Sequence, residues 1–251
     1  MEGSSRYGRQ IAFKGVGEDG QARLSRARAA VIGVGALGTA IANSLARAGF
    51  GFVRLVDPDR VELGNLQRQA LFDEDDAAAG SFKAEAAAAR LARINSTVVL
   101  EPLVARVDAS NVDAVIGDVD LVLDGTDNFE SRYLINDACR RRRLPWVYGG
   151  VLGDSGVSMN VLPDGPCLRC LMPEAPEPGS YETTAEAGVL NQITAIIASI
   201  ESAEAMKIVI GSPRVRRTLA SISLWDASFH LVEVARDPSC PLCGPSANVR
   251  R

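Results

Sequence analysis

A glycine pattern near the N-terminus restricts the fold of this chain more than any other feature. Gly33, Gly35 and Gly38 follow the short apolar run Ala29–Ile32 and precede an alanine-rich stretch. A buried strand, a glycine turn and a helix in this order let a ligand's phosphates approach the helix N-terminus. Asp57 ends the next apolar run, where a carboxylate can accept hydrogen bonds from ribose hydroxyls. The pattern predicts an adenosine-type ligand, and these residues alone favour a nicotinamide dinucleotide.

Short apolar runs alternate with helical stretches over the first 150 residues. Strands are predicted at 29–32, 52–57, 97–102, 121–124 and 145–148, and later ones at 157–162 and 219–225. Helices are predicted at 21–28, from the glycine pattern to about 49, at 83–93, up to about 143, and at 187–211. The alternation predicts an α/β fold with a Rossmann-like, mostly parallel sheet. We expect a single domain with an N-terminal arm (1–28), a nucleotide-binding half (29–150) and a second half (151–251).

The composition of the 251 residues indicates a globular protein and excludes several function classes. Hydrophobic residues make up 47% of the chain, which is enough for a full core. The net charge of -4 argues against a nucleic-acid partner, since binding a phosphate backbone needs a basic face. His230 is the single histidine, so a site built from several imidazoles is excluded. Without an apolar run of membrane-spanning length or a signal-peptide pattern, we expect a cytoplasmic protein with no membrane partner.

Polar residues after Asp57 distinguish a triphosphate from a dinucleotide. Asn65–Gln69 places amides and a guanidinium within five residues, and Lys83 is the one lysine between residues 14 and 207. Asp124–Asn128 follows a predicted strand, at the end where parallel sheets bind ligands. Arginine and lysine beside a phosphate-binding loop suit a polyanionic triphosphate, and a nearby carboxylate can hold Mg²⁺. An NAD-dependent oxidoreductase needs none of these residues and becomes the weaker alternative.

Four of the five cysteines form two Cys-x-x-Cys pairs, Cys167 with Cys170 and Cys240 with Cys243. Four thiolates from two such turns make a closed tetrahedral Zn²⁺ site, which has a structural rather than a catalytic role. Iron–sulfur ligation and disulfides are less favoured, because disulfides are rare in a reducing compartment. The pattern predicts a zinc site that fixes the C-terminal elaboration to the middle of the chain.

Several ordered motifs resemble those of one known family across nearly the whole chain. They are Arg6–Gln10, Gly33–Gly38, Asp57–Asp59, Asn65–Gln69, Thr126–Asn128, Glu186–Val189 and Cys240–Cys243. The chain resembles the ThiF/MoeB/HesA family, the bacterial relatives of ubiquitin-activating enzymes, and is most similar to the MoeB/ThiF type without a rhodanese domain. The resemblance implies a homodimer that binds ATP with Mg²⁺ and carries structural Zn²⁺. It also implies adenylation of the C-terminal glycine carboxylate of a small ubiquitin-like sulfur carrier ending in Gly-Gly, in thiamin, molybdopterin or similar biosynthesis.

The resemblance also implies roles for individual residues. Those implied in catalysis are Arg9, which reaches the partner subunit's ATP, Arg68, Lys83, and Asp127, which is associated with Mg²⁺. Those implied in nucleotide binding are Gly33, Gly35, Gly38, Asp57, Asp59, Asn65, Gln69 and Asn128. Positioning and neutralisation of charge are enough for this reaction, so the scarcity of histidine is no obstacle. A peptide or another carboxylate as substrate, and a non-catalytic nucleotide-binding scaffold, are the alternatives.

Thr184 occupies, within one residue, the position of a cysteine that many members of this family link covalently to the carrier. A threonine hydroxyl is a poor nucleophile and a poor leaving group at neutral pH. The fifth cysteine, Cys139, falls late in a predicted helix and is expected to be structural. We therefore expect activation to stop at the acyl-adenylate. We also expect the segment Pro173–Gly179 to form a crossover above the carrier's tail. Because the chain ends at residue 251 without a sulfurtransferase domain, we expect the sulfur donor to act in trans.

Overall fold

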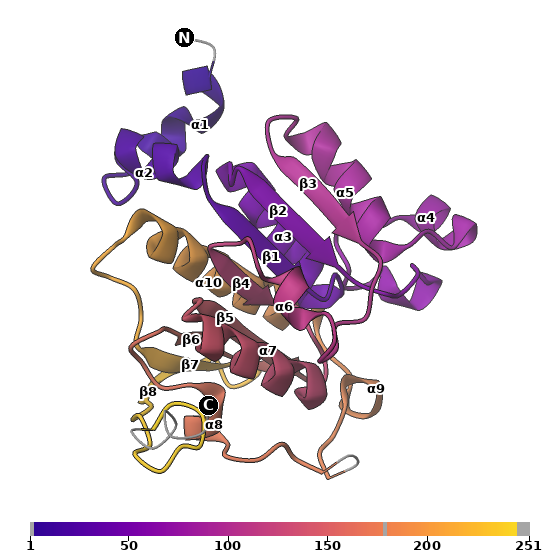
Figure 1. The fold of residues 1–251 in the computed structure, drawn as a ribbon. Coiled ribbons are helices and arrows are strands. Elements are labelled where there is room, and N and C mark those ends of the chain that lie inside the picture. The colour runs from indigo at the N-terminus through magenta and orange to yellow at the C-terminus, as the bar shows by residue number, and fades with distance from the viewer. Residues whose placement is uncertain (1–2, 178–179, 245–251) are drawn as a thin grey trace.

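The computed structural model describes residues 3–177 and 180–244, and these form one eight-stranded mixed sheet in the order β3-β2-β1-β4-β5-β6-β7-β8 (Figure 1). The strands are β1 (Arg28–Ile32), β2 (Phe52–Val56), β3 (Val99–Leu103), β4 (Leu121–Asp124), β5 (Trp146–Leu152), β6 (Ser155–Val161), β7 (Thr218–Ser223) and β8 (Ser228–Glu233). Strands β1 to β5 pair in parallel, and β6, β7 and β8 extend the sheet by antiparallel pairing. The prediction of a Rossmann-like, mostly parallel α/β fold is confirmed.

Helices pack on both faces of the sheet (Figure 1). They are α1 (Gly3–Ile11), α2 (Gly17–Leu24), α3 (Ala36–Ala48), α4 (Glu74–Ala79), α5 (Lys83–Ile94), α6 (Val112–Val115), α7 (Phe129–Arg142), α8 (Leu168–Leu171), α9 (Thr184–Ala187) and α10 (Asn191–Ile210), with a 3-10 turn at Leu63–Asn65. Side chains alternate along β1, so Ala29 and Val31 join the core beneath α3, α5 and α10. Ala30 and Ile32 join the second core beneath α6 and α7. None of the helices in the described residues is long and apolar enough to span a bilayer.

The N-terminal segment differs from the prediction. A helix was expected at 21–28, whereas the helix α2 runs from Gly17 to Leu24 and the strand already begins at Arg28. Gly20 is buried in this helix, where an added Cβ would lie 3.4 Å from Ile210 of α10. Close packing against α10 explains why a glycine is tolerated inside the helix.

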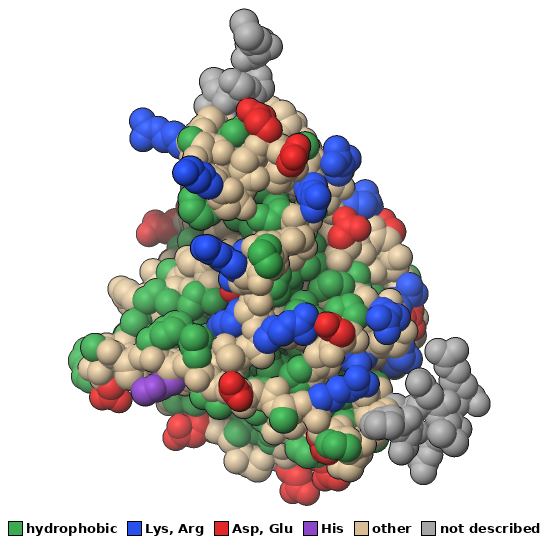
Figure 2. Space-filling model, turned by 90° about the vertical axis from the view of Figure 1, so that its left-hand side faces the viewer, with side chains coloured by type: hydrophobic (Ala, Val, Ile, Leu, Met, Phe, Trp, Pro, Cys, Tyr) green, Lys and Arg blue, Asp and Glu red, His purple; other side chains and the backbone are tan. Residues whose placement is uncertain are grey.

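The edge strand β8 was also missed, because its side chains do not alternate between buried and exposed positions. Phe229, Leu231 and Val232 are all exposed on it. His230 lies on the same strand, outside the cavity described below, and is the purple side chain in Figure 2. An exposed edge strand lacks the period-2 pattern by which sequence identifies half-buried strands.

Candidate functional site

A cavity of about 1080 Å³ lies at the carboxyl ends of the parallel strands, where open α/β sheets bind ligands. Its walls come from the segments that follow β1, β2 and β4, together with the loop before α10. Ten of the residues singled out in the sequence line it: Gly33, Gly35, Asp57, Asp59, Asn65, Arg68, Gln69, Lys83, Asp127 and Asn128. The fold therefore brings residues from four separate motifs to one site.

The glycine loop has no room for side chains at two of its positions. Gly33 has a φ of +86°, and a Cβ there would lie 2.5 Å from the carbonyl oxygen of Gly125. A Cβ at Gly38 would lie 1.8 Å from the carbonyl oxygen of Gly33. Gly38 is therefore a packing residue that lets the loop fold tightly against α3, and it does not itself line the cavity. Gly35 precedes α3 and is on the cavity wall.

Asp57 anchors this loop from the end of β2. Its Oδ2 accepts a hydrogen bond from the backbone N–H of Val34 at 2.7 Å, and its Oδ1 accepts one from Asp59 at 2.8 Å. The side chain is buried, and this burial raises its pKa despite the two hydrogen bonds and the nearby Lys83 charge. A carboxylate has about four acceptor positions, so two remain for the hydroxyls of a ligand.

Two cations line the same cavity as the glycine loop. Lys83 begins α5 and is only 8% exposed, and its Nζ lies 3.1 Å from Oδ2 of Asp59. Arg68 is half-buried, and its Nη1 donates to the carbonyl oxygen of Gly64 at 3.0 Å. Protein oxygens thus hold both cations at the cavity, and this arrangement suits an anionic ligand.

The segment after β4 supplies carboxylate and amide groups. Asn128 caps α7, because its Oδ1 accepts a hydrogen bond from the backbone N–H of Ser131 at 2.9 Å. Asp127 precedes it, is exposed and lines the cavity. Oxygen donors of this kind suit Mg²⁺, and Asp59 offers a second carboxylate on the same wall.

Sequence reasoning missed two features of this wall. Arg132 is 7% exposed and lines the cavity, and its Nη2 donates to the carbonyl oxygen of Thr126 at 2.8 Å. Its position four residues after the helix-capping Asn128 was a usable signal, because that spacing keeps both on one side of the helix. The ring of Tyr181 packs edge-on against that of Phe129, with 4.9 Å between centroids. This contact joins the loop before α9 to the start of α7, and no sequence spacing indicates it.

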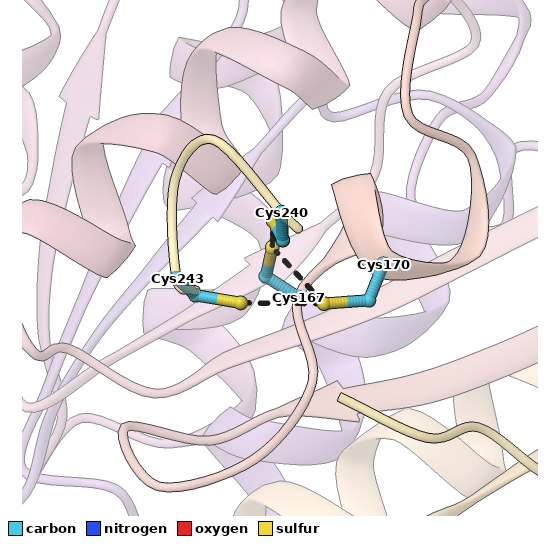
Figure 3. A group of neighbouring side chains, drawn as sticks. All are labelled: Cys167, Cys170, Cys240 and Cys243. Carbon is cyan, nitrogen blue, oxygen red and sulfur yellow. Dashed lines mark hydrogen bonds between the residues drawn. The ribbon is translucent and has the colours of Figure 1, made fainter. Parts of the chain in front are cut away.

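The four paired cysteines meet at the other end of the sheet, where the C-terminal segment lies beside α8 (Figures 1 and 3). Their Sγ atoms all lie within 4.8 Å of one another, with 3.7 Å between Cys167 and Cys240 and 3.2 Å between Cys170 and Cys243. Zn–S bonds of about 2.3 Å in a tetrahedron require S···S separations of about 3.8 Å. The cluster therefore fits a structural zinc ion that joins the C-terminal segment to the middle of the chain.

Contacts around this cluster support its geometry. The backbone N–H of Leu168 donates to Oδ1 of Asn136 at 2.8 Å, and Arg169 makes a two-pronged ion pair with Asp137 at 2.9 and 2.8 Å. Both contacts tie α8 to α7. Cys139, the fifth cysteine, is fully buried in α7, and burial raises its thiol pKa far above the usual range. It has the environment of a structural cysteine rather than a reactive one.

Comparison with known proteins identifies the family. The ThiF family matches residues 7–242 of the sequence. The chain belongs to the ThiF family. Its motifs predicted this membership, and the match confirms it.

Two relatives of this ThiF-family chain are similar over almost their full length. It is 42% identical over 240 residues to the SAMP-activating enzyme E1 of Haloferax volcanii, and the matched region covers 95% of this chain and 88% of that enzyme. It is 40% identical over 253 residues to the sulfur carrier protein adenylyltransferase of Thermus thermophilus, and the matched region covers 98% of this chain and 92% of that protein. Escherichia coli MccB, solved with succinimide, has a TM-score of 0.83 at 22% identity over 95% of this chain and 74% of MccB. This last similarity shows the fold alone.

The structure places Thr184, the residue expected at the position of the family's cysteine, beside the cavity. Thr184 is the first residue of α9, and it lines the cavity together with Thr183. The long helix was expected from residue 187, but Gly188 has a φ of +74° and ends α9, and α10 begins only at Asn191. Backbone hydrogen bonds of Gly153 to Gly188 and Leu190 hold the intervening segment against the sheet.

Two expected features lie partly or wholly away from this cavity. Arg9 is exposed on α1 and does not line the cavity of its own chain. The predicted crossover at Pro173–Gly179 runs without helix or strand through residue 177, and residues 178 and 179 lie outside the described residues.

Proposed function

We propose that this chain uses ATP to adenylate the C-terminal glycine carboxylate of a small ubiquitin-like sulfur carrier ending in Gly-Gly. The observation that carries the proposal is the cavity itself, which gathers the glycine loop, Asp57, Arg68, Lys83 and Asp127 in a member of the ThiF family. The two relatives reported above are named as an activating enzyme and a sulfur carrier protein adenylyltransferase, which supports the carrier as substrate.

In this proposal, the residues of the cavity bind and position the two substrates. Asp57 accepts the ribose hydroxyls, and the loop at Gly33–Gly38 lets the phosphates approach. Asn65, Arg68 and Lys83 contact the phosphates. Mg²⁺, held at Asp127, would neutralise charge on the departing pyrophosphate. The carrier carboxylate attacks the α-phosphorus of ATP. The bond between this phosphorus and the oxygen that bridges it to the β-phosphorus breaks, and pyrophosphate leaves. In-line positioning and fixed positive charge supply the catalysis without a protein nucleophile.

The later steps and the assembly are part of the same proposal. Sulfide attacks the acyl carbon, and AMP leaves to give the thiocarboxylate. When the persulfide of a donor acting in trans attacks instead, AMP leaves an acyl disulfide, and a second thiol then reduces its S–S bond, which releases the thiocarboxylate and leaves that thiol in a disulfide with the donor. The active form is a homodimer in which Arg9 reaches the partner subunit's ATP. One adenylation domain spans 1–251, with an arm at 1–28, nucleotide binding in 29–150, and carrier binding and zinc in 151–251.

The proposal is tested by exchange of labelled pyrophosphate into ATP. Exchange is expected only when ATP, Mg²⁺ and a carrier with a free C-terminal Gly-Gly are all present. The matched control is the same carrier lacking its last glycine, which should support no exchange. Exchange driven by a short peptide but not by any carrier would favour the peptide alternative. Binding of ATP without exchange under any of these conditions would favour a non-catalytic scaffold.

Thr184→Ala is expected to retain pyrophosphate exchange within about twofold of the wild-type rate, because adenylation precedes any covalent link to the loop. Thr184 begins a four-residue helix whose cap is made by Thr183 and Glu186, so its own hydroxyl is not needed for the fold. Initial exchange rates at saturating ATP check this expectation. A loss of tenfold or more in a folded variant would show that the hydroxyl takes part in adenylation.

A further inference from the structure

Three buried side chains at the wall of the cavity each carry a polar atom that makes no hydrogen bond. Among the described residues, Oδ2 of Asp124, Nε of Arg132 and both carboxyl oxygens of Glu201 are buried and make no hydrogen bond. Asp124 ends β4, Arg132 comes from α7 and Glu201 from α10. Buried polar groups are almost always hydrogen-bonded, so such a cluster needs a physical explanation.

Glu201 is enclosed on every side. It is 0% exposed, and a Cβ at Gly149 of β5 would lie 1.9 Å from its Oε1. The titratable and charged groups that face it are Asp124 from β4, Arg132 from α7, Tyr148 from β5, Arg216 from the segment before β7, and Glu204 from its own helix. Only a glycine at position 149 lets the strand approach this carboxyl group so closely.

Of these two buried carboxyl groups, Asp124 has the better environment for a negative charge. Its Oδ1 accepts hydrogen bonds from the backbone N–H and the hydroxyl of Thr126 at 2.9 and 2.7 Å, and Nε of Arg132 lies 3.5 Å from its Oδ2. Glu201 accepts none. Burial raises the pKa of Glu201 well above its usual value and the Asp124 charge adds to this rise, whereas the Arg132 and Arg216 charges act in the opposite direction. Among the described residues, Arg132 forms an ion pair with Asp124, whereas neither Arg132 nor Arg216 forms one with Glu201, so the proton belongs on Glu201.

We propose that Glu201 is a positioning residue for Arg132: it stays protonated in the folded protein, so that the guanidinium remains with Asp124 and Thr126 and faces the cavity. The Nη1 of Arg132 makes no hydrogen bond to another described residue, and the side chain lines the cavity. An ionised Glu201 would attract the guanidinium away from that wall. The proposal rests on the proposed function and adds Arg132 to the side chains that meet an oxyanion of its substrates.

The proton on Glu201 is measured by denaturant unfolding of the wild type and Glu201→Gln at about pH 6 and pH 8. A carboxyl group whose folded pKa is raised stabilises the fold fully below its unfolded pKa, and this stabilisation is lost as pH rises toward the folded pKa. Gln has a similar shape and cannot ionise. The unfolding constant of the wild type, divided by that of the variant, is therefore expected to rise at least about tenfold from pH 6 to pH 8. Because a single proton is involved, this ratio can rise by at most about tenfold for each pH unit. A constant ratio would overturn the proposal.

Glu204→Gln is the matched control, one turn further along α10. Oε2 of Glu204 accepts hydrogen bonds from Nδ2 of Asn160 at 2.7 Å and from the backbone N–H of Arg216 at 3.0 Å, and the carboxylate pairs with Lys207. Glu204 thus has the hydrogen-bond donors and the cation that Glu201 lacks, so the corresponding ratio for Glu204→Gln is expected not to change between pH 6 and pH 8. A change as large as that of Glu201→Gln would mean that the measurement is not specific to Glu201, which would also overturn the proposal.

The positioning role is measured by pyrophosphate exchange. Glu201→Gln is expected to keep at least about half of the wild-type rate, and Glu201→Ala to lose tenfold or more because Arg132 is released into the space that the side chain filled. Equal losses in both variants, or none in a folded Glu201→Ala, would reject the role. If the wild type shows no carrier-dependent exchange, the proposed function fails, while the unfolding comparison still decides the protonation state of Glu201.

Discussion

Lys83→Ala is expected to lower carrier-dependent pyrophosphate exchange by about 10²–10³-fold. The Lys83 side chain is buried, lines the cavity and pairs with Asp59, so in the proposed reaction its charge acts on the phosphates from a largely desolvated position. Loss of a single preorganised group that stabilises developing charge costs about this factor in other enzymes. Exchange rates measured over a range of ATP concentrations would separate a loss in kcat from a rise in KM.

Lys14→Ala is the matched control for this prediction. Lys14 is exposed in the turn after α1 and does not line the cavity, so its replacement should leave exchange unchanged. Both variants should fold, since the ion pair of Lys83 with the largely exposed Asp59 contributes less than about 1 kcal/mol. A folded Lys83→Ala variant with nearly wild-type exchange would remove Lys83 from the reaction.

Cys240→Ser is expected to abolish stoichiometric zinc binding and to lower the free energy of unfolding by at least about 3 kcal/mol. Structural zinc contributes about 10–16 kcal/mol in peptides that fold only with the metal, and this chain has a large core of its own that does not depend on it. The loss should therefore be a fraction of that range. Metal analysis and denaturant unfolding, each with and without a chelator, check both parts of the prediction.

The chain provides a control for this experiment in Cys139→Ala. Cys139 is as buried as the cluster but belongs to α7, and its thiol is not among the four that converge. Its replacement is expected to leave zinc content unchanged. Should Cys240→Ser retain one zinc ion per chain and full stability, the four-cysteine site would be wrong.

The sequence was most informative where function depends on local backbone geometry. The glycine loop and Asp57 were predicted to lie together, and in the structure Asp57 hydrogen-bonds the loop at Val34. This worked because a strand, a tight turn and a helix position one another within about thirty residues. The cysteine pairs were equally informative, because few arrangements other than a metal site bring four thiols from two such turns together.

Boundaries and exposed elements were predicted less well. The helix expected from residue 187 begins at Asn191, since the intervening backbone pairs with Gly153 on a distant turn. The strand β8 was missed because polar and apolar residues alternate only over Ser228–Leu231, and nearly all of its side chains are exposed whichever face they lie on. Both errors come from long-range contacts, which local periodicity does not encode.

By itself, the sequence determined the fold class, the nucleotide loop, the four-cysteine pattern and the family, because each depends on residue types at short spacings. Only the tertiary structure decided how Arg132, Asp124 and Glu201 meet, and that Gly149 makes room for the last of them. These residues lie on α7, β4, β5 and α10, and their charges depend on shared burial rather than on any spacing along the chain. Desolvation in a packed interior is a property of the assembled fold, so the sequence could not reveal which carboxyl group holds the proton.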